Sequence, residues 1–273
     1  MGSTIDEILS GEKINCDAES NYRNYIIVFW SPSDIRGIRI ARYFSKMKKE
    51  YHDKGLGVIG IVVPETDPEK KREYIDGILR GYEIDICSVV DNDLYLWAYF
   101  NNQFLPNLVI MDDHDNMLEE SSGADNIGLL EQKIDELTGS DKTSLREFWD
   151  VNFIDMKYIC NREELSGDPS FMKEVYSAKA GSVTLSGQWV LGGDGFPACD
   201  GDCSISARGK FDEIFLVLET QKKDKLIYDS GGSSREIEVG GFNLIRLDTE
   251  GNSALKTVEI KIGGGIKIYS IQF

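Results

Sequence analysis

The hydrophobic pattern of this 273-residue chain changes near residue 140, and this change limits the possible folds more than any other feature. In the first half, the β-branched and aromatic run at residues 25–30 (YIIVFW) is typical of a strand buried on both faces. Apolar residues then recur at helical spacing from Ile35 to about Tyr51, and residues 56–63 (LGVIGIVV) indicate a second central strand. Strands separated by helices of this length predict a sheet with parallel pairs and right-handed crossovers.

The alternation of strands and helices continues to about residue 137. Thr66 and Glu69 match a capping box, which predicts a helix running to about Arg80. The polar run at residues 112–116 (DDHDN) lacks the glycine and the terminal glutamate of a calcium loop, so we interpret it as a hairpin turn. The other expected elements are a strand at 86–90, a helix at 93–101, the hairpin strands 108–111 and 117–120, and a helix at 127–137.

After Gly139 the helical period disappears. Residues 140–170 contain scattered aromatic side chains and are interpreted as a structured connector. Short β-rich segments with glycine-rich turns follow, at 183–191, 203–207, 213–219, 225–228, 235–239, 243–247, 257–262 and 267–273. They predict an all-β antiparallel sandwich, a jelly roll like that of carbohydrate-binding modules. The expected domains are an α/β domain at 1–139, the connector at 140–170 and the β-sandwich at 171–273.

The charge of the chain excludes several classes of partner. Its net charge is −17, and the first 140 residues hold 14 Lys and Arg against 26 Asp and Glu. Such a surface repels phosphate groups, so we expect neither nucleic acid nor an anionic membrane as a partner. No apolar run approaches the ~20 residues needed to cross a bilayer, and the first residues show no signal-peptide pattern. Because the chain has only two histidines, we expect no metal site and no cofactor.

The segment at residues 28–37 (VFWSPSDIRG) resembles the active site of the thioredoxin family. In that family the first cysteine of a Cys-x-x-Cys pair follows the tryptophan at the end of a strand by four residues and begins a helix. Counting from Trp30 places the two cysteine positions at Asp34 and Gly37. The chain is therefore similar to a thioredoxin whose cysteine pair has been lost.

Further resemblances extend over most of the chain. Leu105-Pro106, which precedes a strand, is similar to the cis-proline that faces the cysteine pair in the family, although an ordinary start of a strand is an open alternative. Residues 91–106 resemble the extended thioredoxin-like region of the cytochrome c biogenesis protein DipZ and its TlpA-like relatives, which carry a β-sandwich behind it. Residues 186–193 and 265–273 look like the first and last strands of that sandwich. The resemblance implies an extracytoplasmic, periplasmic member of the thiol-disulfide oxidoreductase family.

The lost thiols imply a degenerate, redox-inactive site. A carboxylate at position 34 cannot form a mixed disulfide, and the glycine at position 37 cannot resolve one. The helix start favours an anion, so Ser33 or Asp34 is expected to cap the helix, with ligand binding by Asp34 as the alternative. The family's buried proton-shuttling acid lies two residues before the tryptophan, and here that position is Val28.

The groove of the family remains a candidate binding site. By the same resemblance, Trp30, Asp34, Leu105 and Pro106 are expected to hold an extended peptide or protein segment. The residue before a cis-proline can pair its backbone with such a segment, which is how the family holds its substrates. The leading expectation is therefore a non-catalytic binding or adaptor protein.

The cysteines offer a second possible chemistry. Cys199 and Cys203 form the only close pair, and the glycine between them allows a disulfide. A structural disulfide, two free thiols and a working redox centre all stay open for this pair. Cys16, Cys87 and Cys160 lie beside apolar residues and are expected to be inert packing residues.

Two other functions therefore compete with the adaptor role. The first is a thiol-disulfide oxidoreductase that uses Cys199 and Cys203. The second is a carbohydrate-binding module in the β-sandwich, because Trp149, Tyr158 or Trp189 would stack on a sugar if exposed, whereas burial in the core is the alternative for each. A glycan is accordingly a possible ligand.

Overall fold

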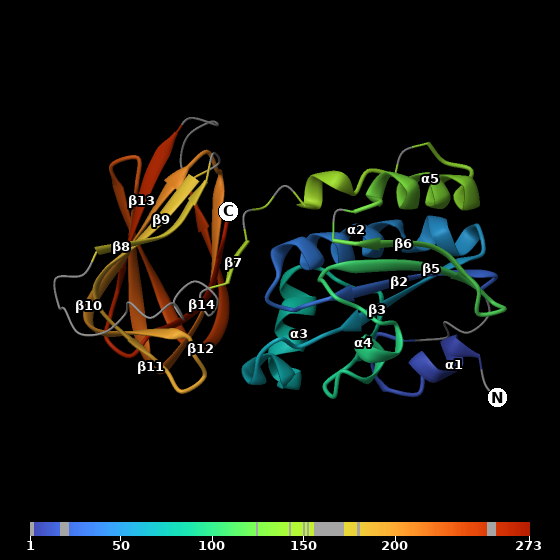
Figure 1. The fold of residues 1–273 in the computed structure, drawn as a ribbon, viewed down its shortest axis with the longest axis horizontal. Helices are drawn as coiled ribbons and strands as arrows, with labels where there is room; N and C mark the ends of the chain where they lie inside the picture. The colour runs from blue at the N-terminus through green and yellow to red at the C-terminus, as the bar shows by residue number, and fades with distance from the viewer. Residues whose placement is uncertain are drawn as a thin grey trace. The chain divides into compact units, whose positions relative to one another are not determined.

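The computed structural model describes residues 3–16, 22–123, 125–141, 143–149, 151, 153–155, 172–178, 181–249 and 255–273. The chain divides into two compact units, Met1–Asp150 and Val151–Phe273 (Figure 1). The division falls inside the connector expected at 140–170. In the described part of the chain, no helix is both long enough and apolar enough to span a membrane.

The first unit is built on a six-stranded sheet in the order β1-β4-β3-β2-β5-β6. Strand β2 is central, and it pairs in parallel with β3 and antiparallel with β5. Strand β3 pairs in parallel with β4, whereas β1 and β6 run antiparallel to their neighbours at the two edges. The strands are β1 (Glu12–Ile14), β2 (Asn24–Trp30), β3 (Leu56–Val62), β4 (Cys87–Val90), β5 (Asn107–Asp112) and β6 (Met117–Ser122).

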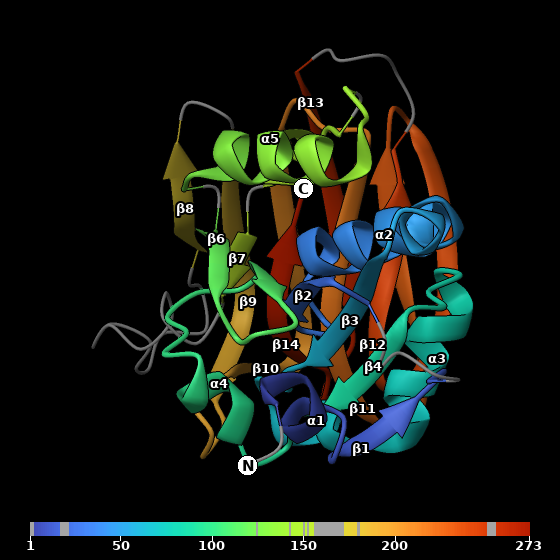
Figure 2. The ribbon, with the colours of Figure 1, turned by 90° about the vertical axis from the view of Figure 1, so that its right-hand side faces the viewer.

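Helices cover both faces of this sheet. They are α1 (Thr4–Ile8), α2 (Ile35–Asp53), η1 (Asp67–Lys70), α3 (Arg72–Gly81), α4 (Tyr95–Tyr99), α5 (Ile127–Thr138) and η2 (Arg146–Trp149). Helices α2 and α5 lie on one face, and α1 and α4 lie on the other (Figures 1 and 2). The odd-numbered residues of β2, such as Ile27 and Phe29, belong to one core cluster with Ile5 of α1 and with Phe100, the residue that directly follows α4. All residues from 25 to 30 are at most 2% exposed, which confirms the strand buried on both faces.

The second unit consists of antiparallel strands. They are β7 (Phe153–Asp155), β8 (Met172–Ala178), β9 (Gly181–Leu191), β10 (Pro197–Gly209), β11 (Glu213–Ser230), β12 (Ser233–Asp248), β13 (Lys256–Ile262) and β14 (Lys267–Gln272). All belong to one hydrogen-bonded sheet in the order β7-β14-β11-β13-β10-β9-β8, with β12 beside β11. The unit is thus β-rich as expected, but its strands form one continuous, curved sheet where the sequence predicted the two sheets of a sandwich.

Two long strands explain this difference. The segments predicted at 213–219 and 225–228 are both parts of β11, which continues through a register shift between Thr220 and Asp224. The segments predicted at 235–239 and 243–247 are likewise joined in β12. Strand β11 pairs with β14 through residues 215–219 and with β13 through residues 227–230. Strand β10 likewise pairs with both β13 and β14, so the strands join into one sheet instead of two separate ones.

A disulfide fastens the edge strand of the first unit. Cys16 follows β1, Cys87 begins β4, and the pairing of Ile14 with Ser88 brings the two cysteines together. The bond joins positions separated by 71 residues. The expectation that Cys16 and Cys87 are unbonded packing residues is therefore wrong, and Cys160 lies outside the described residues.

We predict that this disulfide stabilises the first unit by about 2–4 kcal/mol, because a cross-link that closes a long loop restricts the unfolded chain strongly. The double variant Cys16→Ser/Cys87→Ala should lower the free energy of unfolding by this amount in denaturant titrations. Dithiothreitol should then have little further effect on the transition of the first unit. Equal unfolding midpoints for the variant and the oxidised wild type would contradict the prediction.

Candidate functional site

The junction between β2 and α2 holds the residue at the first cysteine position of the thioredoxin pattern. Asp34 caps α2, and its carboxylate accepts a hydrogen bond of 2.9 Å from the backbone N–H of Arg36. The Arg36 guanidinium donates to both carboxylate oxygens, and its Nη2 lies 2.6 Å from Oδ2. Of the two caps that the sequence allowed, Asp34 is the one used. Its side chain is 1% exposed, so the junction itself occupies the whole carboxylate.

The second cysteine position has no room for a side chain. Gly37 packs directly against Trp30, and a Cβ atom placed on Gly37 would lie 2.8 Å from the Cβ of Trp30. Real Cβ atoms are not found so close to another carbon. Trp30 is completely buried, so the contact cannot relax toward solvent. The close approach of strand and helix therefore requires glycine at position 37.

A second acid, which the sequence did not indicate, is buried close to the same junction. Glu69 is 2% exposed, and its carboxylate accepts hydrogen bonds from Ser31 Oγ at 2.9 Å, the Glu65 N–H at 3.1 Å and Thr66 Oγ1 at 2.8 Å. Beside it, Ser33 Oγ lies 2.9 Å from the hydroxyl of Tyr74. Position 28 is a buried valine, and the acid near the junction comes instead from η1, which follows β3.

Glu69 was predicted to cap a helix, and the structure corrects this prediction. Thr66 makes no side-chain capping bond, and the expected helix is divided into η1 and α3 at Lys71. Glu69 instead turns inward. Burial raises the pKa of its carboxyl group, and the hydrogen bonds from Glu65, Thr66, Ser31 and Ser33 lower it less than burial raises it.

The Leu105-Pro106 bond is cis and lies at the same end of the sheet as Trp30. The register of β5 places Asn107 opposite Phe29, so Pro106 follows the strand pairing directly. Pro106 is buried and Leu105 is partly buried. The preceding residue, Phe104, is 63% exposed. Of the four expected binding residues, three are buried, and Leu105 is the one with exposed surface.

The backbone of Leu105 is open. Within the described part of the chain, neither its N–H nor its C=O makes a hydrogen bond, whereas the neighbouring Pro106 C=O accepts one from Gly123. Such unpaired groups beside a sheet are able to pair with an extended segment of another chain.

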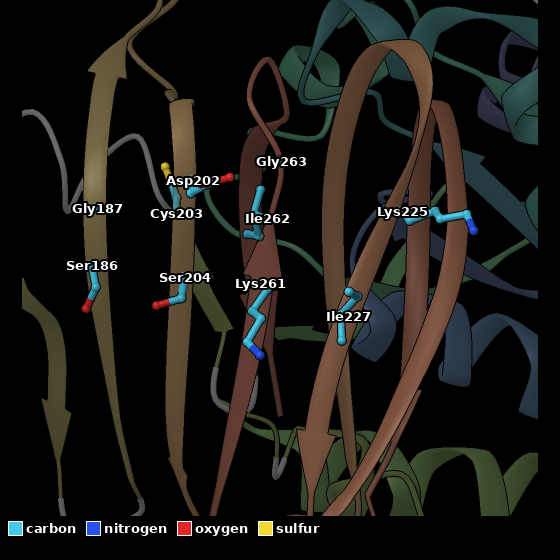
Figure 3. A pocket seen from close by; sticks show the side chains of 10 residues that line it. All are labelled: Ser186, Gly187, Asp202, Cys203, Ser204, Lys225, Ile227, Lys261, Ile262 and Gly263. Atoms are coloured by element: carbon cyan, nitrogen blue, oxygen red, sulfur yellow. The ribbon is translucent and has the colours of Figure 1, made fainter.

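The second unit contains the other candidate residues. Cys199 and Cys203 form a disulfide across a bulge in β10, and both are at most 5% exposed. Cys203 lines an open cavity of about 540 Å³ on the sheet, where Ser186 and Ser204 lie on paired positions of β9 and β10 (Figure 3). The lining residues are Ser186, Gly187, Asp202, Cys203, Ser204, Lys225, Ile227, Lys261, Ile262 and Gly263. None of them is aromatic, so this cavity offers no ring on which a sugar would stack.

The three candidate sugar-stacking residues are placed differently. Trp189 is 6% exposed and belongs to the core of the second unit. Trp149 is partly buried in η2, and Tyr158 lies outside the described residues. The structure therefore does not bring the three rings together on one described surface.

Among the described residues, the one cluster with metal-ligand spacing is Asp112, Asp113 and His114 in the β5–β6 turn. Its groups serve the turn itself. The Asp112 carboxylate accepts hydrogen bonds from the backbone N–H groups of His114 and Asn116, and Asp113 lies 2.7 Å from the His114 ring. This arrangement agrees with the hairpin turn that the sequence indicated.

This chain is similar to several solved protein structures. No protein family and no curated protein sequence matches this chain. A thioredoxin-like protein solved in its oxidized form is 19% identical, with 47% of this chain and 90% of that chain covered and a TM-score of 0.42. A putative thioredoxin from Neisseria meningitidis is 20% identical (47% and 83% covered, TM-score 0.38). A putative thiol:disulfide interchange protein DsbE from Chlorobium tepidum is 16% identical (44% and 82% covered, TM-score 0.37).

Strand order and connectivity define the class of the first unit. A central β2 leads into α2, β3 and β4 lie parallel on one side of it, and β5 and β6 lie antiparallel on the other, with a cis-proline directly before β5. These features are those of the thioredoxin-like fold, as the sequence predicted. The helix start of this unit has a buried aspartate and a glycine at the two cysteine positions.

We predict that Gly37→Ala destabilises the protein by about 1–3 kcal/mol, because the added methyl group overpacks against Trp30. Gly77→Ala is the matched control. Gly77 lies inside α3, and no atom lies within 4 Å of the place that an added methyl group would take, so alanine there should stabilise the helix by up to about 1 kcal/mol. Thermal and denaturant unfolding would measure both changes. Equal effects at the two positions would rule out the close approach at Gly37.

Glu69 predicts a pH dependence of stability. Its pKa in the folded protein lies above its ordinary value of 4.5, so between these two values the folded state binds more protons than the unfolded state. The contribution of protonated Glu69 to the free energy of unfolding is thus fully present below pH 4.5 and is lost as the pH rises through the folded-state pKa. Glu69→Gln, which mimics the protonated acid, should gain stability relative to wild type over this rise. Parallel stability curves for wild type, Glu69→Gln and the exposed control Glu73→Gln would contradict this assignment.

Proposed function

We propose that this chain is a thioredoxin-fold binding protein that does not exchange thiols and that holds an extended segment of a peptide or protein partner beside Leu105. One observation carries the proposal. The β2–α2 junction is closed around Asp34, whereas the neighbouring Leu105 has an unpaired backbone within the described part of the chain.

The closed junction supports the absence of thiol exchange. Exchange needs an accessible thiolate, and a low thiol pKa is commonly produced by a helix start. Here the helix start binds the Asp34 carboxylate, and Arg36 neutralises its charge. The space that a resolving cysteine would need at position 37 is filled by Trp30. The electrostatic features that would activate a thiol are thus used to stabilise the fold.

The Leu105 segment supports the binding role. A partner segment in extended conformation would accept a hydrogen bond from the Leu105 N–H and donate one to its C=O, as in strand addition. The exposed ring of Phe104 provides an adjoining apolar contact. In this proposal the buried Trp30, Asp34 and Pro106 support the segment, and Leu105 and Phe104 contact the partner.

The two disulfides support an extracytoplasmic location. Cys16–Cys87 and Cys199–Cys203 are both formed, and such bonds persist in oxidising compartments. The resemblance to DipZ and its TlpA-like relatives points to the same location, and within it to the periplasm.

Thiol exchange at Cys199–Cys203 is the alternative function. The bond between these residues favours it, but the described part of the second unit has no helix whose start could lie beside either sulfur, and both residues are buried. Sugar binding by the second unit is a further alternative, and the described cavity supplies hydroxyl, carboxylate and ammonium groups without an aromatic ring.

We predict that the protein does not accelerate insulin reduction above the rate with dithiothreitol alone, because Asp34 cannot form a mixed disulfide. The decisive comparison is with Cys199→Ser/Cys203→Ser. Turnover by the wild type that disappears in this double variant would establish the alternative redox function. Turnover that survives in it but disappears in Cys16→Ser/Cys87→Ala would refute the absence of thiol exchange at the thioredoxin-like unit, because these two are the cysteines of that unit.

We predict that an unfolded polypeptide with blocked thiols binds to the Leu105 segment. Reduced lysozyme treated with iodoacetamide is a suitable probe, because it is extended and has no reactive thiol. Phe104→Ala should weaken its binding about tenfold, as expected for loss of an aromatic contact at an interface. Leu129→Ala removes a comparably exposed apolar side chain from α5 and should leave binding unchanged. Equal affinities for wild type and Phe104→Ala would contradict binding at this segment.

A further inference from the structure

One stretch of the first unit has an unusual distribution of charge. Residues 81–132 contain no Lys or Arg, although at the chain's average of 30 in 273 they would hold about six. The same stretch contains eleven acidic residues: Glu83, Asp85, Asp91, Asp93, Asp112, Asp113, Asp115, Glu119, Glu120, Asp125 and Glu131. It includes α4, the Leu105 segment and the β5–β6 hairpin.

Within this stretch, the acids between residues 91 and 125 also lack a Lys or Arg partner among the described residues. Elsewhere in the unit, acids pair with cations, as in Glu12–Arg72, Asp34–Arg36, Asp67–Lys70, Asp76–Arg72, Glu83–Arg42 and Asp85–Lys48. Between residues 91 and 125, no described acid is paired with a Lys or Arg, and the described contact of an acid with a basic side chain there joins Asp113 to the His114 ring. The negative charge of this region is therefore not neutralised within the described unit.

Apolar side chains are exposed in the same stretch. In the described part of the first unit, the large apolar residues with high exposure all lie between residues 94 and 129. They are Leu94, Tyr95, Tyr99, Phe104, Met117 and Leu129, which are 44% to 63% exposed. Leu94 also has a left-handed backbone with φ of 57°, which disfavours a branched side chain. Neither the core nor the backbone conformation explains an exposed leucine at this position.

Direct contacts join several of these groups into one surface on α1 and α4. The ring centroids of Tyr95 and Tyr99 lie 6.4 Å apart. The negative charge of Glu7 and a hydrogen bond between Glu7 and Tyr95 both raise the pKa of Tyr95. Thr4 at the start of α1 lies 3.2 Å from the Tyr99 hydroxyl, and its N–H donates to Asp115 at 2.7 Å. Figure 2 shows α1 and α4 side by side on the same face of the sheet.

We infer that this α1–α4 surface, formed by Glu7, Leu94, Tyr95, Tyr99 and Asp115, binds a basic segment of the partner protein. A Lys or Arg side chain of the segment lies against the tyrosine rings, with its cation near Glu7 and Asp115. An adjoining apolar residue of the segment packs on Leu94. The inference rests on the proposed function and names the chemistry of the partner.

Charge complementarity decides between the possible occupants. Acidic carboxylates beside aromatic rings attract a cation and repel an anion, so phosphate-bearing ligands and anionic membranes do not fit this surface. A second copy of this chain, with a net charge of −17, would bring like charge to an acidic surface. A basic and partly apolar segment satisfies both the unpaired acids and the exposed rings.

The test compares peptides that differ in charge alone. The probe is a short fluorescent peptide that alternates arginine with leucine, and the matched peptide has citrulline in place of every arginine. Fluorescence anisotropy with the full chain should show at least tenfold tighter binding of the arginine peptide, decreasing as salt is added. Equal binding of the two peptides would overturn the inference.

Variants then locate the site. Glu7→Gln and Tyr95→Ala should each weaken binding of the arginine peptide about threefold, whereas Tyr95→Phe keeps the ring and should bind nearly as wild type. Glu73→Gln on α3 is the control for loss of one exposed carboxylate and should have no effect. A loss of affinity that is equal for Glu7→Gln and Glu73→Gln would show a nonspecific charge effect and overturn the inference.

The outcomes also separate this inference from the proposed function. Binding of both peptides equally, with loss in Phe104→Ala, would retain the proposed function and overturn the basic partner. Selective binding of the arginine peptide that Phe104→Ala leaves unchanged would retain the basic partner and overturn binding at the Leu105 segment. Absence of binding by either peptide and by the unfolded probe would overturn both.

Discussion

The carboxylate of Asp34 at the start of α2 is the interaction on which the rest of the site depends. It caps the helix through the Arg36 N–H and is neutralised by the Arg36 guanidinium, and it is almost completely buried. A buried carboxylate without such partners would be strongly destabilising, so the cap and the ion pair must form together. The pair lies at the start of α2, and one turn further along the helix Gly37 packs against Trp30.

The closed β2–α2 junction and the proposed binding segment at Leu105 are different parts of this unit. Hydroxyl groups of Ser31 and Thr66 satisfy the buried Glu69, and Tyr74 lies against Ser33, so these side chains are bonded to one another. A site closed in this way has little capacity for chemistry. The open backbone lies one strand away, before β5. The exposed rings of Tyr95 and Tyr99 lie on α4, and the unpaired acids Glu7 and Asp115 lie on α1 and in the β5–β6 turn. In the proposed function, binding uses the edge of this junction, while its buried centre stabilises the fold.

Sequence reasoning predicted most of the first unit because local patterns and the fold agree there. Buried β-branched runs gave β2 and β3, and helical spacing gave α2. The cap at Asp34 followed from its place at a helix start. By contrast, the Cys16–Cys87 bond depends on the pairing of β1 with β4 across 71 residues, which no local spacing reveals. The predicted helix cap at Glu69 was wrong. Thr66 and Glu69 have the spacing of a capping box, but the Glu69 carboxylate is buried and accepts a hydrogen bond from the hydroxyl of Ser31.

In the second unit, the positions of the strands were predicted better than the way in which the strands pair into a sheet. Glycine-rich turns marked the segment ends, but a bulge inside β11 and glycines inside β12 look like turns in a sequence. The pairing of both β11 and β10 with β13 and β14 shows that the strands form one sheet. The basic partner that we infer could not be derived from local patterns either, because that inference depends on which acids contact a cation in the folded chain.

Amide hydrogen exchange measured by NMR, residue by residue, tests the central claim most directly. The account predicts slow exchange for the Arg36 N–H, which is bonded to the buried Asp34 carboxylate, and fast exchange for the Leu105 N–H, which is unpaired. Adding a saturating peptide ligand should then slow exchange at Leu105 and leave Arg36 unchanged. Fast exchange at Arg36 in the free protein, or protection that appears at Arg36 and not at Leu105 on binding, would contradict a closed junction beside an open binding segment.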